Sequence, residues 1–243
     1  MNFHPCLLAP VYNHGRSLVM IADQLRAIAL PCILVNDGSN AATRDELQRI
    51  GQSHAGIEVL HHDRNRGKGA ACITGLRHAR SRGYTHVVQV DADGQHDLAD
   101  LPAFVDAARE HPTRFIMGEP VFDASIPKHR YYGRYLTHVL VWIECLSTAL
   151  KDTMCGYRVY PLESVTKILD RHRVGQRMDF DPEIAVRLYW EGVQPMAIPT
   201  KVVYRPDAVS HFRMFRDNVL ISWMHTRLLL GMLPRIPRLL KRR

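Results

Sequence analysis

The chain has 243 residues, of which 46% are hydrophobic and 23% charged, a length and composition typical of one globular α/β domain. Its formal net charge is +8. Residues 201–243 hold ten Lys and Arg against two Asp, so the whole excess lies in the C-terminal tail. No base-stacking or groove-reading motif accompanies this charge, and a basic end alone is not the pattern of a nucleic-acid-binding protein. We expect no nucleic-acid partner.

The cysteines and the hydropathy of the chain indicate in which cellular compartment the protein lies. The five cysteines are scattered, without the spacing of a disulfide framework or a zinc site, which favours a reducing compartment. We expect no signal peptide at residues 1–5, because no basic region followed by a long apolar run occurs there. No stretch approaches the roughly 18 consecutive apolar residues that span a bilayer. We expect a cytoplasmic protein that is soluble or peripheral to a membrane.

Strand and helix patterns alternate through the first half. Apolar runs predict strands at 6–12, 32–37, 57–60, 86–90 and 115–117, and helices are predicted near 16–29, 68–82 and 98–110. This alternation predicts an α/β fold with a mostly parallel sheet and helices on both faces. Such sheets bind ligands outside the carboxyl ends of their strands. The polar motifs follow these strands, so we expect a single site at that edge.

The second half is predicted to be mainly helical, with helices at 131–150, 162–172, from Asp181 onward, and 212–230. The last helix carries Phe and Trp near helical spacing and is followed by a basic run. We predict a domain over 1–205 and a basic amphipathic segment over 206–243 that associates with an anionic membrane surface. The alternative is a helix packed on the core with a solvated basic tail.

Asp91 and Asp93 follow the strand at 86–90, one residue apart. Two neighbouring carboxylates repel each other unless a cation lies between them, and Mg²⁺ or Mn²⁺ accepts such oxygen ligands while keeping positions open for phosphates. The pattern indicates a metal–diphosphate site. The alternative is a solvated loop with two acidic residues.

Two further positions suit a nucleotide ligand. Asp37 lies just past a strand and can accept a hydrogen bond from a base, while Tyr12 offers a ring face for stacking. Lys68, between two glycines at a predicted helix start, is placed to meet a diphosphate. The alternatives are a turn-forming aspartate, a tyrosine at the edge of the core and a solvated lysine.

Four motifs occur in a characteristic order: Pro10-Val-Tyr-Asn13, Val35-Asn-Asp-Gly-Ser39, Asn65-Arg-Gly-Lys-Gly69 and Asp91-Ala-Asp-Gly-Gln-His96. Together they resemble family 2 glycosyltransferases, and most closely the dolichyl- or polyprenyl-phosphate sugar synthases. The resemblance extends to residues 152–158 and 180–183. It implies a GT-A fold, a UDP- or GDP-linked sugar donor, a divalent metal (Mg²⁺ or Mn²⁺) and inversion at the anomeric carbon.

The resemblance also implies roles for individual residues. The metal set is Asp91, Asp93 and Gln95. The donor-binding set is Pro10, Tyr12, Asn13, Val35, Asp37, Lys68, Asp91, Ala92 and Asp93. His211 and Arg213, further along the chain, are candidates to close over the diphosphate.

The acceptor side leaves two alternatives open. A hydroxyl acceptor needs a general base, for which the candidates are Asp152, Asp181 and Glu183. The resemblance favours Asp152 as the acidic residue near the sugar, while Asp181-Pro182-Glu183 also fits a helix start. A phosphate acceptor is already an anion and needs cations, for which the candidates are Arg130, Arg134 and Arg158.

The chain departs from this subgroup at two places near the donor. His14 stands where a glutamate is usual, and Gly118-Glu119-Pro120, with Asp123 nearby, stands where Gly-x-Arg is usual. The identity of the donor therefore stays open. Residues 210–218 resemble bacterial members encoded with aryl-polyene lipid pathways.

These observations lead to one main hypothesis, a metal-dependent inverting glycosyltransferase at the inner face of the cell membrane. It would deliver a hexose to a lipid-linked acceptor such as polyprenyl phosphate. The alternatives are a catalytically inactive membrane-bound scaffold of the same fold and a transferase with a hydroxyl acceptor. A dinucleotide-dependent oxidoreductase is set aside because no Gly-x-Gly-x-x-Gly turn follows any predicted strand.

Overall fold

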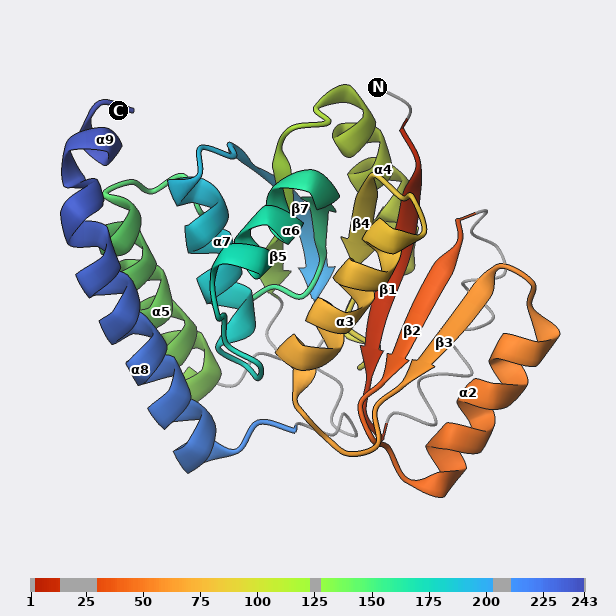
Figure 1. Cartoon of the computed structure of the whole chain (residues 1–243). Helices are drawn as coiled ribbons and strands as arrows, with labels where there is room; N and C mark the ends of the chain where they lie inside the picture. Colours follow the sequence, from red (N-terminus) through yellow and green to blue (C-terminus); the bar gives the residue numbers. More distant parts are fainter. Residues whose placement is uncertain (1–2, 14–29, 123–127, 203–210, 243) are drawn as a thin grey trace.

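The computed structural model describes residues 3–13, 30–122, 128–202 and 211–242. Its centre is a seven-stranded sheet in the order β3-β2-β1-β4-β6-β5-β7 (Figure 1). Only β6 runs antiparallel to its neighbours, so the mostly parallel α/β fold is confirmed. The strands are β1 (Pro5–Val11), β2 (Cys32–Asn36), β3 (Ile57–His61), β4 (His86–Gln89), β5 (Phe115–Phe122), β6 (Arg158–Pro161) and β7 (Pro195–Val202).

Helices cover both faces of the sheet (Figure 1). Successive side chains of β1 enter opposite cores, with Leu8 on one face and Leu7 on the other. A strand buried on both faces is continuously apolar, as β1 and β2 are. The helices are α2 (Ala41–Ser53), α3 (Lys68–Ser81), α4 (Leu101–Glu110), α5 (Lys128–Cys145), α6 (Leu162–Arg171), α7 (Phe180–Trp190), α8 (Met214–Met232) and α9 (Ile236–Leu240), with 3₁₀ turns at Leu98–Asp100 and Leu233–Arg235.

α5 and α8 pack side by side at the end of the molecule opposite α2 (Figure 1). Met224 and Leu228 of α8 are fully buried in the same core as α3 and α7. The other face of α8 is exposed, with Phe215 86% and Trp223 59% accessible. The predicted C-terminal helix therefore packs on the domain and also presents an apolar face. Within the described ranges, no helix has the length and apolar character needed to cross a bilayer.

Several elements differ from the sequence predictions. The helix expected over 131–150 ends at Cys145, because Leu146 adopts a left-handed conformation with φ of 48°. α2, β6 and β7 were not predicted; β7 contains Pro195 and Pro199, which an edge strand tolerates. The helix expected near 16–29 lies outside the described residues.

Candidate active site

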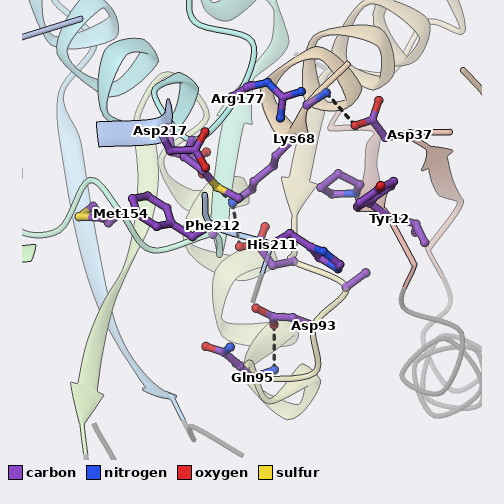
Figure 2. A pocket seen from close by; sticks show the side chains of 18 of the residues that line it. Tyr12, Asp37, Lys68, Asp93, Gln95, Met154, Arg177, His211, Phe212 and Asp217 are labelled. Carbon is purple, nitrogen blue, oxygen red and sulfur yellow. Dashed lines mark hydrogen bonds and ion pairs between the residues drawn. The ribbon is translucent and has the colours of Figure 1, made fainter. Parts of the chain in front are cut away.

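A cavity of about 520 Å³ lies at the carboxyl edge of the parallel strands (Figure 2). Residues that follow β1, β2 and β4 meet there because these strands are adjacent in the sheet. Most of the residues singled out in the sequence line it: Pro10, Tyr12, Asn13, Asp37, Lys68, Asp91, Ala92, Asp93, Gln95, Arg134, Asp181, His211 and Arg213.

Lys68 joins two carboxylates at this cavity. Its Nζ lies 2.7 Å from Oδ2 of Asp91 and 2.6 Å from Oδ2 of Asp181. Burial lowers the pKa of Lys68, but the negative charges of Asp181 and Asp91 outweigh it and raise that pKa above its usual value. The ammonium is therefore permanently charged, and it fixes two side chains from opposite halves of the sequence.

Asp91 has one oxygen free for a ligand. Its Oδ2 accepts a hydrogen bond from the ammonium of Lys68, whereas its buried Oδ1 has no hydrogen-bond partner among the described residues. Gly156 packs directly against this carboxylate, and a Cβ at that position would lie 2.0 Å from Oδ2. Asp93 faces the cavity beside Gln95, whose backbone N–H donates to Oδ1 of Asp93 at 3.0 Å (Figure 2).

The chemistry of this donor set fits a hard divalent cation. Asp91, Asp93 and Gln95 supply only oxygen ligands among their acceptor atoms, and the unpartnered Oδ1 of Asp91 is the kind of buried acceptor that a cation satisfies. The described residues contain no group of three His, Cys, Asp or Glu side chains placed to hold a metal. Mg²⁺ is commonly held by one or two carboxylates and completed by substrate phosphates and water, and such a site suits this arrangement.

Asp37 holds the loop that leads into α3. Its two carboxylate oxygens accept hydrogen bonds from the backbone N–H groups of Arg66 and Gly67 at 2.9 and 2.8 Å and from Nδ2 of Asn65 at 3.0 Å. The ring of His62 makes a further contact at 2.8 Å. The sequence suggested that Asp37 binds a base; here its carboxylate is occupied by the loop that positions Lys68.

The side of the cavity next to β1 contains Tyr12 and Asn13. The Tyr12 ring meets His211 edge-on, with 4.9 Å between ring centroids. Asn13 has a φ of 55°, a left-handed conformation that asparagine tolerates, and its Oδ1 accepts the backbone N–H of Asn40. The end of β1 is thus tied to the start of α2.

A loop before α7 contributes residues that the sequence analysis missed. The carbonyl of Gln176 accepts the backbone N–H of Ala70 at 2.9 Å, and Nη2 of Arg177 donates to Oδ1 of Asn65 at 3.2 Å. Arg177 lines the cavity with Lys68 nearby (Figure 2). The sequence points to Arg177 only through its position just before the motif at 180–183.

Asp152 positions an arginine rather than facing the cavity. Nη1 of Arg134 donates to its Oδ2 at 2.5 Å, and the backbone N–H groups of Met154 and Cys155 donate to its Oδ1. Burial raises the pKa of Asp152, but the opposing effect of Arg134 and His138 is larger. The pKa of Asp152 therefore lies well below its usual value. The cavity is lined by Arg134 and not by Asp152.

The structure contradicts two further sequence assignments. Arg158 is fully buried and donates to the carbonyls of Cys155 and Asp181, both at 2.7 Å, so it is unavailable to an acceptor phosphate. Glu183 is fully buried outside the cavity. Val35 has its side chain in the hydrophobic core, and its assignment to the donor stays a prediction.

Asp181 lines the cavity but is not a free base. Burial raises its pKa, whereas Lys68 and then Arg158 lower it, and the net direction is downward. Arg130 belongs to α5, and its side chain lies outside the described residues.

The start of α8 forms another wall of the cavity. The backbone N–H of Arg213 donates to Oδ2 of the buried Asp217 at 2.7 Å, while no described residue forms a hydrogen bond with Oδ1 of Asp217. Phe212 and Asp217 line the cavity beside His211, and neither was singled out in the sequence (Figure 2). His96 also lines it; burial lowers the pKa of His96, while Asp91 and Asp93 act in the opposite direction.

Comparison with known proteins identifies the family of this chain. The family model described as Glycosyl transferase family 2 matches residues 6–166, more than half of the chain. The chain belongs to this family. An undecaprenyl-phosphate mannosyltransferase of Micrococcus luteus is 34% identical over 170 residues, covering 66% of this chain and 68% of that protein.

A second relative is the dolichyl-phosphate beta-glucosyltransferase ALG5D of Trichomonas vaginalis, 29% identical over 163 residues. The alignment covers 63% of this chain and 48% of that protein, so the chain spans about half of that relative's length. Both of these relatives are named as glycosyltransferases that act with a lipid phosphate.

Solved structures show that the fold is GT-A. Glucosyl-3-phosphoglycerate synthase from Mycobacterium tuberculosis, in complex with Mn²⁺ and UDP-glucose, matches with a TM-score of 0.69 and 13% identity, over 95% of this chain and 79% of that one. The mannosyltransferase PcManGT from Pyrobaculum calidifontis, in complex with GDP-Man and Mn²⁺, matches with a TM-score of 0.58 and 17% identity, over 85% and 59%.

Proposed function

We propose that this glycosyltransferase moves a hexose from a UDP- or GDP-linked donor to a lipid-linked acceptor such as polyprenyl phosphate, in a metal-dependent reaction with inversion. The observation that carries the proposal is the pairing of Lys68 with Asp91, whose other carboxylate oxygen is buried and unpartnered beside Asp93. Relatives named undecaprenyl-phosphate mannosyltransferase and polyprenol monophosphomannose synthase support the acceptor class.

The donor would occupy the side of the cavity formed by β1, β2 and α3. Tyr12 offers a ring for the base, and the start of α3 presents Lys68 and backbone N–H groups to the diphosphate. Asp91, Asp93 and Gln95 would hold the divalent metal. When bound, such a metal acts as a Lewis acid that stabilises the negative charge developing on the leaving nucleoside diphosphate.

The ion pairing and burial of the three candidate bases favour a phosphate acceptor over a hydroxyl acceptor. A hydroxyl must lose a proton to a base, but Asp152 and Asp181 are ion-paired with lowered pKa values. Glu183 is sealed in the core by Arg187 and Arg227. A phosphate is already anionic and needs only a positive group, and Arg134, fixed by Asp152, supplies one at the cavity wall.

Asp217 is a further candidate base in the hydroxyl alternative, because within the described ranges its Oδ1 has no hydrogen-bond partner. Replacing Asp217 with Asn separates the two acceptors. If the acceptor is a phosphate, the pH profile of the transfer rate should be the same in the variant and the wild type. If the acceptor is a hydroxyl deprotonated by Asp217, the acidic limb of that profile would be lost in the variant.

A membrane location follows from a lipid-linked acceptor. α5 and α8 both begin at the cavity end of the molecule, where α3 also begins (Figure 1). Their first turns expose large apolar side chains: Tyr132, Tyr135, Leu136, Met214, Phe215 and Val219. We infer peripheral association of this end with the anionic inner face of the cell membrane, supported by these exposed apolar side chains.

The deciding experiment measures release of nucleoside diphosphate from a panel of UDP- and GDP-sugars, with Mn²⁺ or Mg²⁺, with and without polyprenyl phosphate. Release that requires both metal and lipid phosphate establishes the proposal and names the donor. The variant Asp91→Asn/Asp93→Asn is the control and should be inactive. Turnover of that variant at the wild-type rate would refute metal-dependent transfer at this site.

A further inference from the structure

A second cavity, of about 550 Å³, adjoins the candidate active site. It lies between the loop before α3, the loop before α7 and the start of α8, and shares Asn65 and Arg177 with the first cavity. We call it the arginine pocket. Its charged lining residues are Arg64, Arg66, Arg177, Arg216 and Asp179.

The positive charge of the arginine pocket is largely unpaired. In the part of the chain that the structure describes, the side chains of Arg64, Arg66 and Arg216 have no hydrogen-bond or ion-pair partner. Arg177 donates to Asn65, which is neutral. The single carboxylate, Asp179, is buried and already accepts the backbone N–H of Arg177 at 3.0 Å. An anion with several acceptor oxygens, such as a phosphate, suits four guanidinium groups.

The walls of the pocket are fixed before any ligand arrives. The loop carrying Arg66 is held by Asp37, which accepts the Arg66 backbone N–H at 2.9 Å. α8 is tied to α7 by the buried pair of Arg227 and Glu183 at 3.0 Å. The arginines therefore project from anchored backbone, which reduces the ordering cost of binding.

The surroundings of the pocket indicate which phosphate it receives. Leu220 forms part of its wall, and on the same helix Phe215 is 86% and Val219 53% exposed. A free phosphate would use the arginines alone, whereas a phospholipid presents a phosphate next to acyl chains that such apolar side chains contact. α8 begins at the cavity end of the molecule (Figure 1).

We propose that the arginine pocket binds the phosphate of an anionic phospholipid headgroup. The proposal rests on the membrane location inferred above and deepens it. Because the pocket and the active site share Asn65 and Arg177, a bound headgroup holds the active-site cavity at the surface where a lipid-linked acceptor arrives.

The test compares two variants that lose the same charge. Arg64→Gln/Arg216→Gln alters the pocket, and Arg80→Gln/Arg114→Gln removes two exposed arginines elsewhere. Binding is measured by sedimentation with vesicles of phosphatidylcholine, with or without phosphatidylglycerol. We expect the pocket variant to lose roughly tenfold or more in affinity for the anionic vesicles, and the control about twofold at most.

Two results would overturn the proposal. Equal losses in the two variants would show that the attraction depends on total charge. If inorganic phosphate bound the wild type and not the pocket variant in calorimetry, while vesicle binding was unchanged, the pocket would be a site for a free anion.

A vesicle-free assay separates this proposal from the proposed function. The pocket variant should transfer sugar to a short, water-soluble prenyl phosphate at the wild-type rate. If the wild type transfers no sugar to any prenyl phosphate, the proposed acceptor is wrong, while the vesicle comparison still decides the pocket.

Discussion

Lys68 and Asp181 lie 113 positions apart in the sequence, and their side chains form an ion pair of 2.6 Å at the cavity. The same ammonium pairs with Asp91, so one lysine holds the loop that carries Asp91 and Asp93 against α7. Replacing Lys68 with Met leaves two carboxylates facing each other with little solvent. We expect the free energy of unfolding to fall by about 3–5 kcal/mol and kcat/KM for the donor to fall about a hundredfold.

Chemical denaturation and steady-state kinetics check this prediction. Lys167→Met is the matched control, because Lys167 pairs with Glu163 on the exposed face of α6. It should leave stability and activity unchanged. Wild-type stability in Lys68→Met would mean that the ion pairs contribute nothing to the fold.

Asp93 should govern donor binding through the metal. We expect Asp93→Asn to weaken binding of a nucleotide-sugar in the presence of Mn²⁺ by about tenfold or more, because an amide replaces a charged oxygen ligand. Isothermal titration calorimetry measures this directly. Asp97→Asn is the control, since Asp97 is exposed and caps the turn at Leu98–Asp100, a role that asparagine also fills. Equal affinities in the two variants would contradict a metal role for Asp93.

Gly156 must lack a side chain because of Asp91. A Cβ there would lie 2.0 Å from Oδ2, so Gly156→Ala forces the carboxylate and its lysine partner to move. We expect a loss of about 1–3 kcal/mol in stability and a fall in donor affinity. Gly133→Ala is the contrast: no atom of the described residues lies within 4 Å of its added Cβ, and alanine favours the helix. Thermal unfolding of both variants tests the difference, and an unchanged melting temperature in Gly156→Ala would contradict the packing.

The pairing of Asp152 with Arg134 predicts a pH dependence of stability. The pKa of Asp152 is lowered on folding, so the stabilisation is present above the unfolded value of about 3.9 and is lost as the pH falls toward the folded value. Asp152→Asn removes it at every pH. The free energy of unfolding of the wild type should therefore fall more steeply between pH 5 and pH 3 than that of the variant. Parallel curves from urea denaturation would contradict the shift.

Glu183 should affect stability and not the chemistry. Its carboxylate is fully buried between Arg187 and Arg227 and also accepts the backbone N–H of Gly175. We expect Glu183→Gln to lower the free energy of unfolding by about 3 kcal/mol, with an unchanged pH profile of kcat. Loss of the acidic limb of that profile would restore Glu183 as a catalytic base.

Local sequence patterns were sufficient to predict the parallel strands β1 to β4 and the position of the site. Apolar runs identify β1, β2, β3 and β4, and parallel neighbours bring their carboxyl ends to one edge. Tyr12, Lys68, Asp91 and Asp93 follow those strands, so their meeting in one cavity was predictable. The edge strand β7, with its two prolines, and the four-residue β6 carry too little periodicity to be recognised.

The sequence by itself determined which chemical groups follow each strand, because an apolar run and the polar motif after it are local features of the chain. Only the tertiary structure decided which of those groups remain available. Asp152 is neutralised by Arg134 from α5, and Glu183 by Arg227 from α8. Arg158, expected at a phosphate, instead binds buried carbonyls. Ion pairs between separate elements depend on how helices pack, and no spacing along the chain specifies that distance.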